Sequence, residues 1–224
     1  MNEIEQSSLD FLKDLSNNNN KPWFDEHRST FEGVKKNMRS FFEMVHRELQ
    51  KYDSIEEMHF FRINRDVRFS KDKSPYKSNI GVEYRRRKPQ LRGGYYLHIE
   101  PGNKSFLAGG FWAPSKEDTL RIRQEFEMDA NPMREIMEKP RFKSVFGTIN
   151  GEKLSSAPKG FDKSHPNIDL IRHKNWYFET HFTDAEVLAK DFHKSVVEAF
   201  ILLRPYFDYM SEVLGTDSNG QRVY

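Results

Sequence analysis

The residues best suited to chemistry lie between positions 61 and 77, where basic side chains recur every two or three positions with aromatic residues between them. Six cations face two carboxylates in this segment. Guanidinium and ammonium groups bind phosphate and carboxylate through charge-assisted hydrogen bonds, and free N–H groups of a loop add further donors. The segment therefore predicts an anion-binding site, and its ligand contacts are predicted to be Arg62, Arg65, Arg68, Lys71, Lys73, Tyr76 and Lys77.

Four further residues are predicted to support this site. Asp66 and Asp72 would hold the arginines in place. Tyr96, His98 and Glu100 alternate along a strand-like run and so share one face, where His98 and Glu100 could form an acid/base pair or two metal ligands. Two ligands are too few for a metal ion, and no HExxH or comparable spacing links them to another histidine. A hydrogen-bonded structural histidine is the competing interpretation, and neither a metal nor a cofactor is predicted.

Two other functions compete with anion binding. Residues 85–88 form a second basic cluster, and a combined basic face over residues 62–92 could contact the phosphates of a nucleic acid, although no known nucleic-acid motif is present. Alternatively, the arginines and aspartates form a salt-bridged network in a structural or partner-docking module, where surface ion pairs contribute little to stability. Residues 59–92 carry eleven basic and three acidic side chains, a net charge of +8, whereas the remainder carries −6. This asymmetry favours a small anionic ligand, and enzymatic activity is left open.

Composition excludes several classes of protein. The chain has no cysteine, which rules out disulfides, thiolate metal sites and cysteine nucleophiles. The common nucleotide-binding, hydrolase and kinase motifs are absent as well. The first residues lack the basic and apolar regions of a signal peptide, and no run of about 18 apolar residues occurs. We therefore expect a cytoplasmic protein that does not enter a membrane.

The elements that must position these residues can be predicted from the periodicity of apolar side chains. A helix is expected to start near Ser8, and one asparagine of the run 17–20 should cap a second helix over about 21–52. Alternation then predicts a strand or broken strand over 61–69, with a polar loop after it. Three more strand-like runs, separated by turn residues, predict an antiparallel meander: 80–86, 94–100 and 105–112.

The second half of the chain is mainly helical in this prediction. Capping signals at Ser115 and Thr183 open two helices, the second of which should run to about Tyr209 with a kink or break at Pro205. Between them, a short helix over 131–137, a loop region with a short strand at 146–149, and a strand over 175–182 are expected. The fold class is α+β, with a central antiparallel sheet of about 59–112 plus about 175–182 packed by N-terminal and C-terminal helices. One domain over 1–224 is predicted, with a loose tail after about 215.

Three blocks of the sequence have a distinctive composition: Asn17–Phe24, Arg62–Lys77, and Tyr95–Gly102 followed by Ala108–Pro114. Together they resemble the domain of unknown function family 2461, a group of uncharacterised, mainly bacterial proteins. The resemblance spans nearly the whole chain. It implies a single domain, without an assigned reaction and without catalytic residues to transfer.

Overall fold

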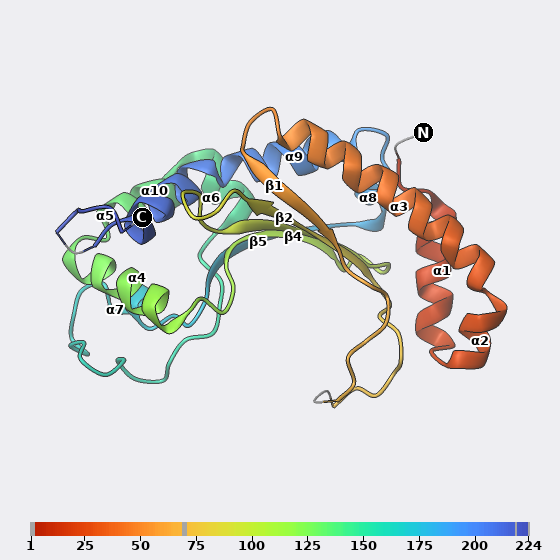
Figure 1. Ribbon diagram of the computed structural model, residues 1–224, viewed down its shortest axis with the longest axis horizontal. Coiled ribbons are helices and arrows are strands. Elements are labelled where there is room, and N and C mark those ends of the chain that lie inside the picture. The colour runs from red at the N-terminus through yellow and green to blue at the C-terminus, as the bar shows by residue number, and fades with distance from the viewer. Residues whose placement is uncertain (1–2, 69–70, 218, 224) are drawn as a thin grey trace. The chain divides into compact units, whose positions relative to one another are not determined.

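A five-stranded antiparallel sheet forms the centre of the computed structural model, which describes residues 3–68, 71–217 and 219–223 (Figure 1). The strands are hydrogen-bonded in chain order: β1 (Ile55–Phe60), β2 (Ile80–Arg86), β3 (Gly94–Ile99), β4 (Ser105–Phe111) and β5 (Trp176–Phe182). Strands β2, β3 and β4 match the three predicted runs of the meander, β1 precedes them at residues that were not predicted as a strand, and β5 joins the free edge of β4 after a helical region. The predicted α+β fold class is confirmed.

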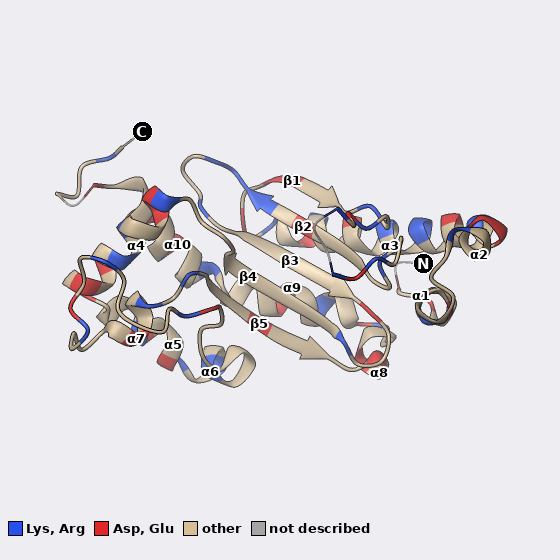
Figure 2. Cartoon of the chain, turned by 90° about the horizontal axis from the view of Figure 1, so that it is seen from below, with Lys and Arg blue, Asp and Glu red and all other residues tan. Residues whose placement is uncertain are grey.

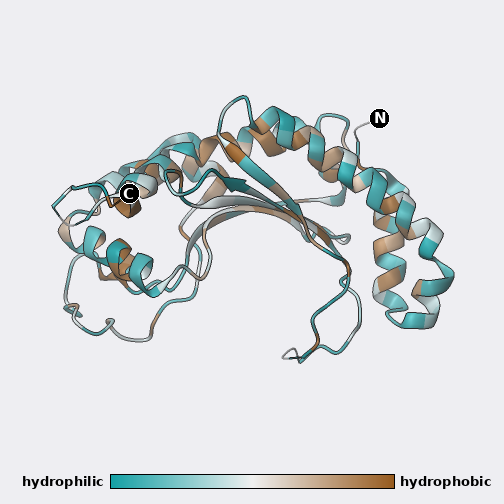
Figure 3. Cartoon of the chain, in the orientation of Figure 1, coloured by the Kyte–Doolittle hydropathy of each residue, from teal (hydrophilic) through white to brown (hydrophobic). Residues whose placement is uncertain are grey.

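Helices flank this sheet in the sequence on both sides. The first three are α1 (Gln6–Asn17), α2 (Lys21–Glu26) and α3 (Arg28–Leu49). Four follow β4: α4 (Lys116–Met128), α5 (Asn131–Glu138), α6 (Pro140–Phe146) and α7 (Ile168–Ile171). The last three are α8 (Asp184–Val187), α9 (Phe192–Leu202) and α10 (Arg204–Gly215). Hydrophobic and hydrophilic residues alternate along α1 and α3 with a helical period, so each helix buries one side (Figure 3).

The predicted helix caps are present. Asn20 accepts a hydrogen bond from the backbone N–H of Trp23, as one of the four asparagines was expected to do. Ser115 accepts from the N–H of Asp118 at the start of α4. Thr183 and Glu186 form a complete capping box at the start of α8.

The chain divides into two compact units, which are described separately. The first contains residues 1–84, 96–107 and 181–198, and the second contains 85–95, 108–180 and 199–224. In the first unit, the hydroxyl of Tyr84 donates to the carbonyl of Phe42 at 3.0 Å, which fixes β2 to α3. In the second, the hydroxyl of Tyr206 donates to the carbonyl of Trp176 at 2.8 Å. The single-domain organisation stays a prediction.

Within the first unit, the two faces of the sheet differ in burial. Val82, Leu97 and Leu107 are completely buried on the face that packs against the helices. Tyr96 and Phe106, which alternate with them, are half-buried on the opposite face. Because side chains alternate along a strand, the side chains of β3 form a buried apolar row and a half-buried row that contains Tyr96.

The strand predicted over 61–69 is wrong. Strand β1 ends at Phe60, and the described residues that follow are irregular, with one isolated antiparallel bridge between Asn64 and Tyr76. The segment folds back on itself, because the N–H of Arg65 donates to the carbonyl of Pro75 at 2.9 Å and that of Lys77 to Ile63 at 2.8 Å. Positions 69 and 70 lie outside the described residues. We call residues 61–79 the basic loop.

Three other boundaries differ from the prediction. The helix expected over 21–52 is broken at His27, which stacks on Trp23 at 4.1 Å and caps both α2 and α3. The last helix is interrupted between α8 and α9, at residues 188–191, which was not predicted; its break between α9 and α10 at Pro205 was predicted and is confirmed. The strand expected over 146–149 is also wrong, since α6 ends at Phe146 before Gly147 with φ of 63°.

Candidate functional site

The basic loop is anchored at its C-terminal side by Tyr76. The side-chain amide of Asn19 donates to the carbonyl of Tyr76 at 2.9 Å, and the N–H of Tyr76 donates back to Asn19 at 3.1 Å. The ring of Tyr76 stacks on Phe24 at 4.0 Å and is buried. Tyr76, predicted as a ligand contact, therefore packs as the anchor that joins the asparagine run before α2 to the basic loop.

Two arginines of the loop are paired with the two aspartates. Arg68 binds Asp66 through two parallel hydrogen bonds of 3.0 and 2.6 Å, and these lower the pKa of the Asp66 carboxyl. Arg65 lies 3.2 Å from Asp72. Asp72 also accepts hydrogen bonds from the N–H and the hydroxyl of Ser74, which lower its pKa. These two ion pairs are the contacts that the alternative of a salt-bridged network predicts.

The other cations of the loop have no carboxylate partner among the described residues. Lys73 donates to the backbone carbonyl of Val67 at 2.9 Å. Lys71 and Arg62 are exposed. The ammonium group of Lys77 lies 5.5 Å from the centre of the Phe61 ring.

Arg62, Arg65 and Lys77 form a group that we call the root cluster. The pKa of Lys77 is lowered, mainly by burial and further by repulsion from Arg62 and Arg65. The Nε atom of Arg65 is buried and has no hydrogen-bond partner in the described part of the chain. Asp72 thus pairs with Arg65, the charge of Arg62 acts on Asp66, and Lys77 has no carboxylate partner in the described part of the chain.

On β3, Tyr96, His98 and Glu100 form a hydrogen-bonded row. The Nε2 atom of His98 lies 2.8 Å from the carboxylate of Glu100, and its Nδ1 atom lies 3.2 Å from the hydroxyl of Tyr96. The hydrogen bond from His98 lowers the pKa of Glu100, and burial raises the pKa of Tyr96 to about 12. His98 also stacks on Phe106 at 4.6 Å. The imidazole of His98 thus connects the hydroxyl of Tyr96 to the carboxylate of Glu100.

The root cluster and the row meet at Phe61. Its ring contacts Lys77 on one side and lies 6.0 Å from the ring of Tyr96, edge to face. Gly81 permits this arrangement, because a Cβ atom there would lie 2.5 Å from the Tyr96 hydroxyl. Phe61 thus links Lys77 of the root cluster to Tyr96 of the row.

The family described as "Conserved hypothetical protein (DUF2461)" matches residues 7–209, which is most of the chain. The chain belongs to this family. No curated protein and no solved structure matches it. The resemblance carried by the three sequence blocks is therefore confirmed, and the structure shows that the first two blocks of this DUF2461 protein are joined through Asn19 and Tyr76.

The second basic cluster of the DUF2461 chain is less available than its sequence indicates. Figure 2 shows Lys and Arg gathered in the basic loop and at the end of β2. Arg86 is completely buried, and it donates to Asp208 at 2.8 Å, to Ser211 at 3.2 Å and to the carbonyl of Arg92 at 3.0 Å. Arg87 and Lys88 are exposed. Arg86 therefore holds the second unit together and cannot reach a phosphate.

Sequence reasoning missed Asn19, Phe61 and Gly81 as parts of the site. The asparagine run was interpreted only as a helix cap, although a polar run beside a helix start also offers side-chain groups to a neighbouring loop. Within the described ranges, no three histidine, aspartate or glutamate side chains are arranged to hold a metal ion. Among the helices of those same ranges, none has the length and apolar composition that a membrane crossing requires.

Proposed function

We propose that this DUF2461 protein binds a small ligand that carries a phosphate or carboxylate group, and that the root cluster holds that group. The observation that carries the proposal is the positive charge at Arg62, Arg65 and Lys77, where Arg65 pairs with Asp72, Arg62 acts on Asp66, and Lys77 has no carboxylate partner among the described residues. An anion placed among them would relieve the repulsion that lowers the pKa of Lys77.

The donors of the cluster suit a tetrahedral or planar oxyanion. Arg65 has one guanidinium nitrogen on Asp72 and a buried Nε without a partner. A guanidinium group presents several N–H donors in a fixed plane, whereas lysine contributes a point charge. An anion can therefore accept from the free edge of Arg65 while Lys77 and Arg62 balance its charge.

The row on β3 gives this binding site a route to catalysis. Phe61 contacts Lys77 and lies next to Tyr96, so a ligand in the root cluster would lie near the first hydroxyl of the row. His98 and Glu100 would then accept or return a proton. Proton transfer to or from the bound ligand is the reaction class that this arrangement supports.

The alternatives explain fewer of the contacts. A purely structural network accounts for the pairs Arg65–Asp72 and Arg68–Asp66, but not for Arg62 and Lys77. A nucleic-acid surface over residues 62–92 loses Arg86, which is buried. Binding of a small anion is the function that uses the unpaired cations.

Calorimetric titration with inorganic phosphate, acetate and adenosine monophosphate tests the proposal. We expect at least one of these anions to bind saturably, and Lys77→Met and Arg62→Ala each to weaken its affinity about tenfold. Lys36→Ala is the control, because Lys36 is an exposed lysine on α3 outside the predicted site. Equal weakening by Lys36→Ala would show that the effect comes from the net charge of the protein, and no binding of any of the three anions would overturn the proposal.

The pH dependence of the same titration gives a second test. Lys77 must be protonated to attract an anion, and burial together with Arg62 and Arg65 lowers its pKa below the ordinary value of 10.5. Affinity should therefore decline with rising pH before an ordinary lysine would titrate. In Lys77→Arg this decline should disappear, because a guanidinium group stays charged throughout the range.

A further inference from the structure

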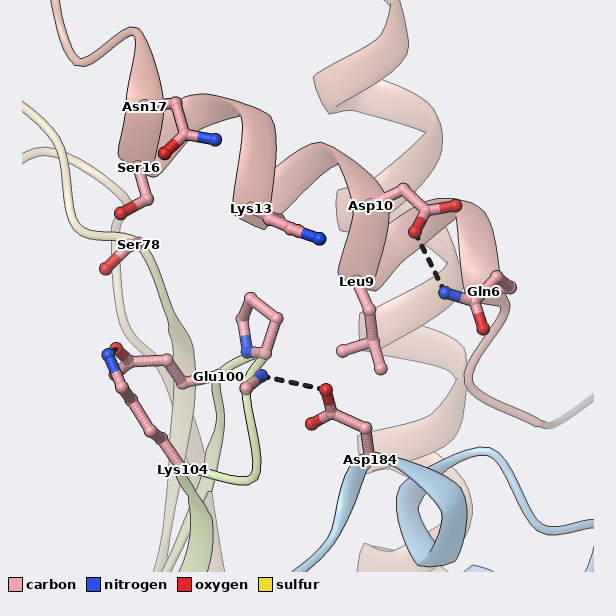
Figure 4. Close-up of a pocket in the computed structure, with 12 residues that line it drawn as sticks. Gln6, Leu9, Asp10, Lys13, Ser16, Asn17, Ser78, Glu100, Lys104 and Asp184 are labelled. Carbon is pink, nitrogen blue, oxygen red and sulfur yellow. Dashed lines mark hydrogen bonds and ion pairs between the residues drawn. The ribbon is translucent and has the colours of Figure 1, made fainter.

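A hollow of about 280 Å³ lies in the first unit (Figure 4). Its lining includes Ser78 of the basic loop and Glu100 of the row, but not Arg62, Arg65 or Lys77 of the root cluster. Helix α1 forms one wall through Lys13, Ser16 and Asn17. The turn between β3 and β4, with Pro101, forms part of the facing wall. Its volume is at the small end of the range for ligand pockets, which is about 300–1,000 Å³.

Opposite charges face each other across this hollow without meeting. Figure 4 shows Lys13 reaching from α1 into the hollow and Asp184 pointing into it from the start of α8. Lys13 makes no ion pair within the described residues, and neither does Asp184. The hollow therefore contains an ammonium group and a carboxylate without ion-pair partners on facing walls. Three further charged residues line it: Asp10, which accepts a hydrogen bond from Gln6, and Glu100 and Lys104, which lie 3.6 Å apart as an ion pair.

The Asp184 carboxylate is fixed in place. One oxygen accepts from the N–H of Gly102 at 2.8 Å and the other from the N–H of Asn103 at 2.9 Å. The N–H of Asp184 in turn donates to the side chain of Asn103 at 2.8 Å. These hydrogen bonds hold the carboxylate in one position at the wall of the hollow.

The remaining lining supplies polar and apolar contacts of the kind a small organic ion needs. The hydroxyls of Ser16 and Ser78 and the amide of Asn17 line the hollow and make no side-chain hydrogen bond to the described protein. Leu9 and Pro101 provide apolar surface between the charged groups. A ligand bound here could place carbon atoms against these two residues and its charges at the two walls.

We infer that this hollow binds a small zwitterion, a molecule that carries an ammonium group and a carboxylate a few bonds apart, as free amino acids do. Its carboxylate would face Lys13, Ser16 and Asn17, and its ammonium group would face Asp184. Each charge of the ligand would then meet an opposite charge of the protein that has no ion-pair partner. The inference goes beyond anion binding at the root cluster and does not depend on it.

The experiment begins with calorimetric titration of the full chain with a panel of the proteinogenic amino acids. For the amino acid that binds most tightly, the titration is repeated with the analogue that lacks the carboxylate and with the analogue that lacks the ammonium group. We expect saturable binding of the amino acid, and affinities about tenfold weaker for each singly charged analogue. Equal affinity for the amino acid and either analogue would overturn the zwitterion, as would the lack of any binding up to about 10 mM.

Variants locate the site. Lys13→Met and Asp184→Asn should each weaken amino-acid binding about tenfold, since each removes one of the two charges. Lys13 is exposed, so its replacement leaves the fold intact even if Asp184→Asn loosens the turn. Lys36→Met is the control, because Lys36 is an exposed lysine on α3 that does not line the hollow.

Lys77→Met separates this inference from the proposed function. Loss of phosphate binding with unchanged amino-acid binding would show two independent sites. Unchanged amino-acid binding in Lys13→Met would place the zwitterion elsewhere and overturn the assignment.

Discussion

Arg86 and the root cluster show what the same kind of charge does in two surroundings. Arg86 is completely buried in the second unit, yet its guanidinium group reaches Asp208, Ser211 and the carbonyl of Arg92 and lies 5.1 Å from the centre of the Phe207 ring. In the first unit, the root cluster of Arg62, Arg65 and Lys77 is less buried, and Arg65 is its only member with an ion pair among the described residues. The more buried cation is the better satisfied one.

The difference teaches that pairing, and not charge density, separates a structural cation from a binding cation. A buried charge is tolerated only when neighbouring groups compensate it, so Arg86 has no capacity left for a ligand. Incomplete compensation in the root cluster is tolerated because Arg62 is exposed and Arg65 and Lys77 are only partly buried. The following predictions test this contrast.

Removal of Arg86 should produce the largest loss of stability. Arg86→Ala removes three hydrogen-bonded contacts and leaves a cavity beside Phe207, and we expect a decrease of roughly 3–5 kcal/mol in the free energy of unfolding. Urea unfolding followed by circular dichroism measures this change. Arg87→Ala, at the exposed neighbouring position, should stay within about 0.5 kcal/mol of the wild type.

A loss below about 1 kcal/mol in Arg86→Ala would mean that burial and pairing do not make this arginine structural. Arg86 would then no longer serve as the structural cation with which the root cluster is compared. Anion binding at the root cluster should be unaffected in Arg86→Ala as long as the variant is folded.

Acidification should have the next largest effect, through His173 in the second unit. His173 is completely buried, and burial lowers the pKa of its imidazole from 6.5 to about 4. Between these values the unfolded chain binds a proton that the folded chain does not, so stability falls as pH decreases from 6.5 to 4 and is unaffected by His173 above 6.5. This histidine should contribute up to about 3 kcal/mol of that loss.

Urea unfolding at several pH values between 4 and 7 checks the contribution of His173. In His173→Leu the dependence of stability on pH should become shallower over this interval, whatever the stability of the variant at pH 7. His181→Gln, at an exposed histidine, is the matched control and should keep the slope of the wild type. If His173→Leu has the same slope as the wild type, the protein must stabilise the protonated imidazole of His173, as it stabilises the charge of Arg86.

Much of the fold follows from short-range patterns. The strands β2, β3 and β4 show period-two alternation between turn residues, and the caps at Asn20, Ser115 and Thr183 are set by contacts over three residues. The strand expected over 61–69 failed because alternation there serves the folding of the basic loop onto itself, not pairing with the sheet. Alternation indicates extended backbone without indicating its partner.

The site divides in the same way. The row of Tyr96, His98 and Glu100 was predictable, because residues two apart share a face of a strand. The partners of Arg86 and Tyr76 were not predictable, because they are distant in the sequence. Arg86 binds Asp208, which is 122 residues away, and Tyr76 binds Asn19, which is 57 residues away. One local signal did exist for Arg86: it lies in phase with the buried Val82 and Tyr84, on the apolar side of β2.

Neutralising Asp72 should change phosphate affinity only slightly, and the direction of this change is informative. Asp72→Asn removes the carboxylate that pairs with Arg65, while the amide oxygen can still accept from Ser74 and preserve the turn. If the root cluster binds anions, phosphate affinity should increase about fivefold, as expected for removing one nearby like charge in a solvated setting. Calorimetric titration at constant ionic strength measures the change, and Asp191→Asn, which removes an exposed aspartate from the same unit, controls for net charge. Decreased affinity in Asp72→Asn would instead mean that Asp72 must orient Arg65 for binding, and unchanged affinity would remove Arg65 from the cluster.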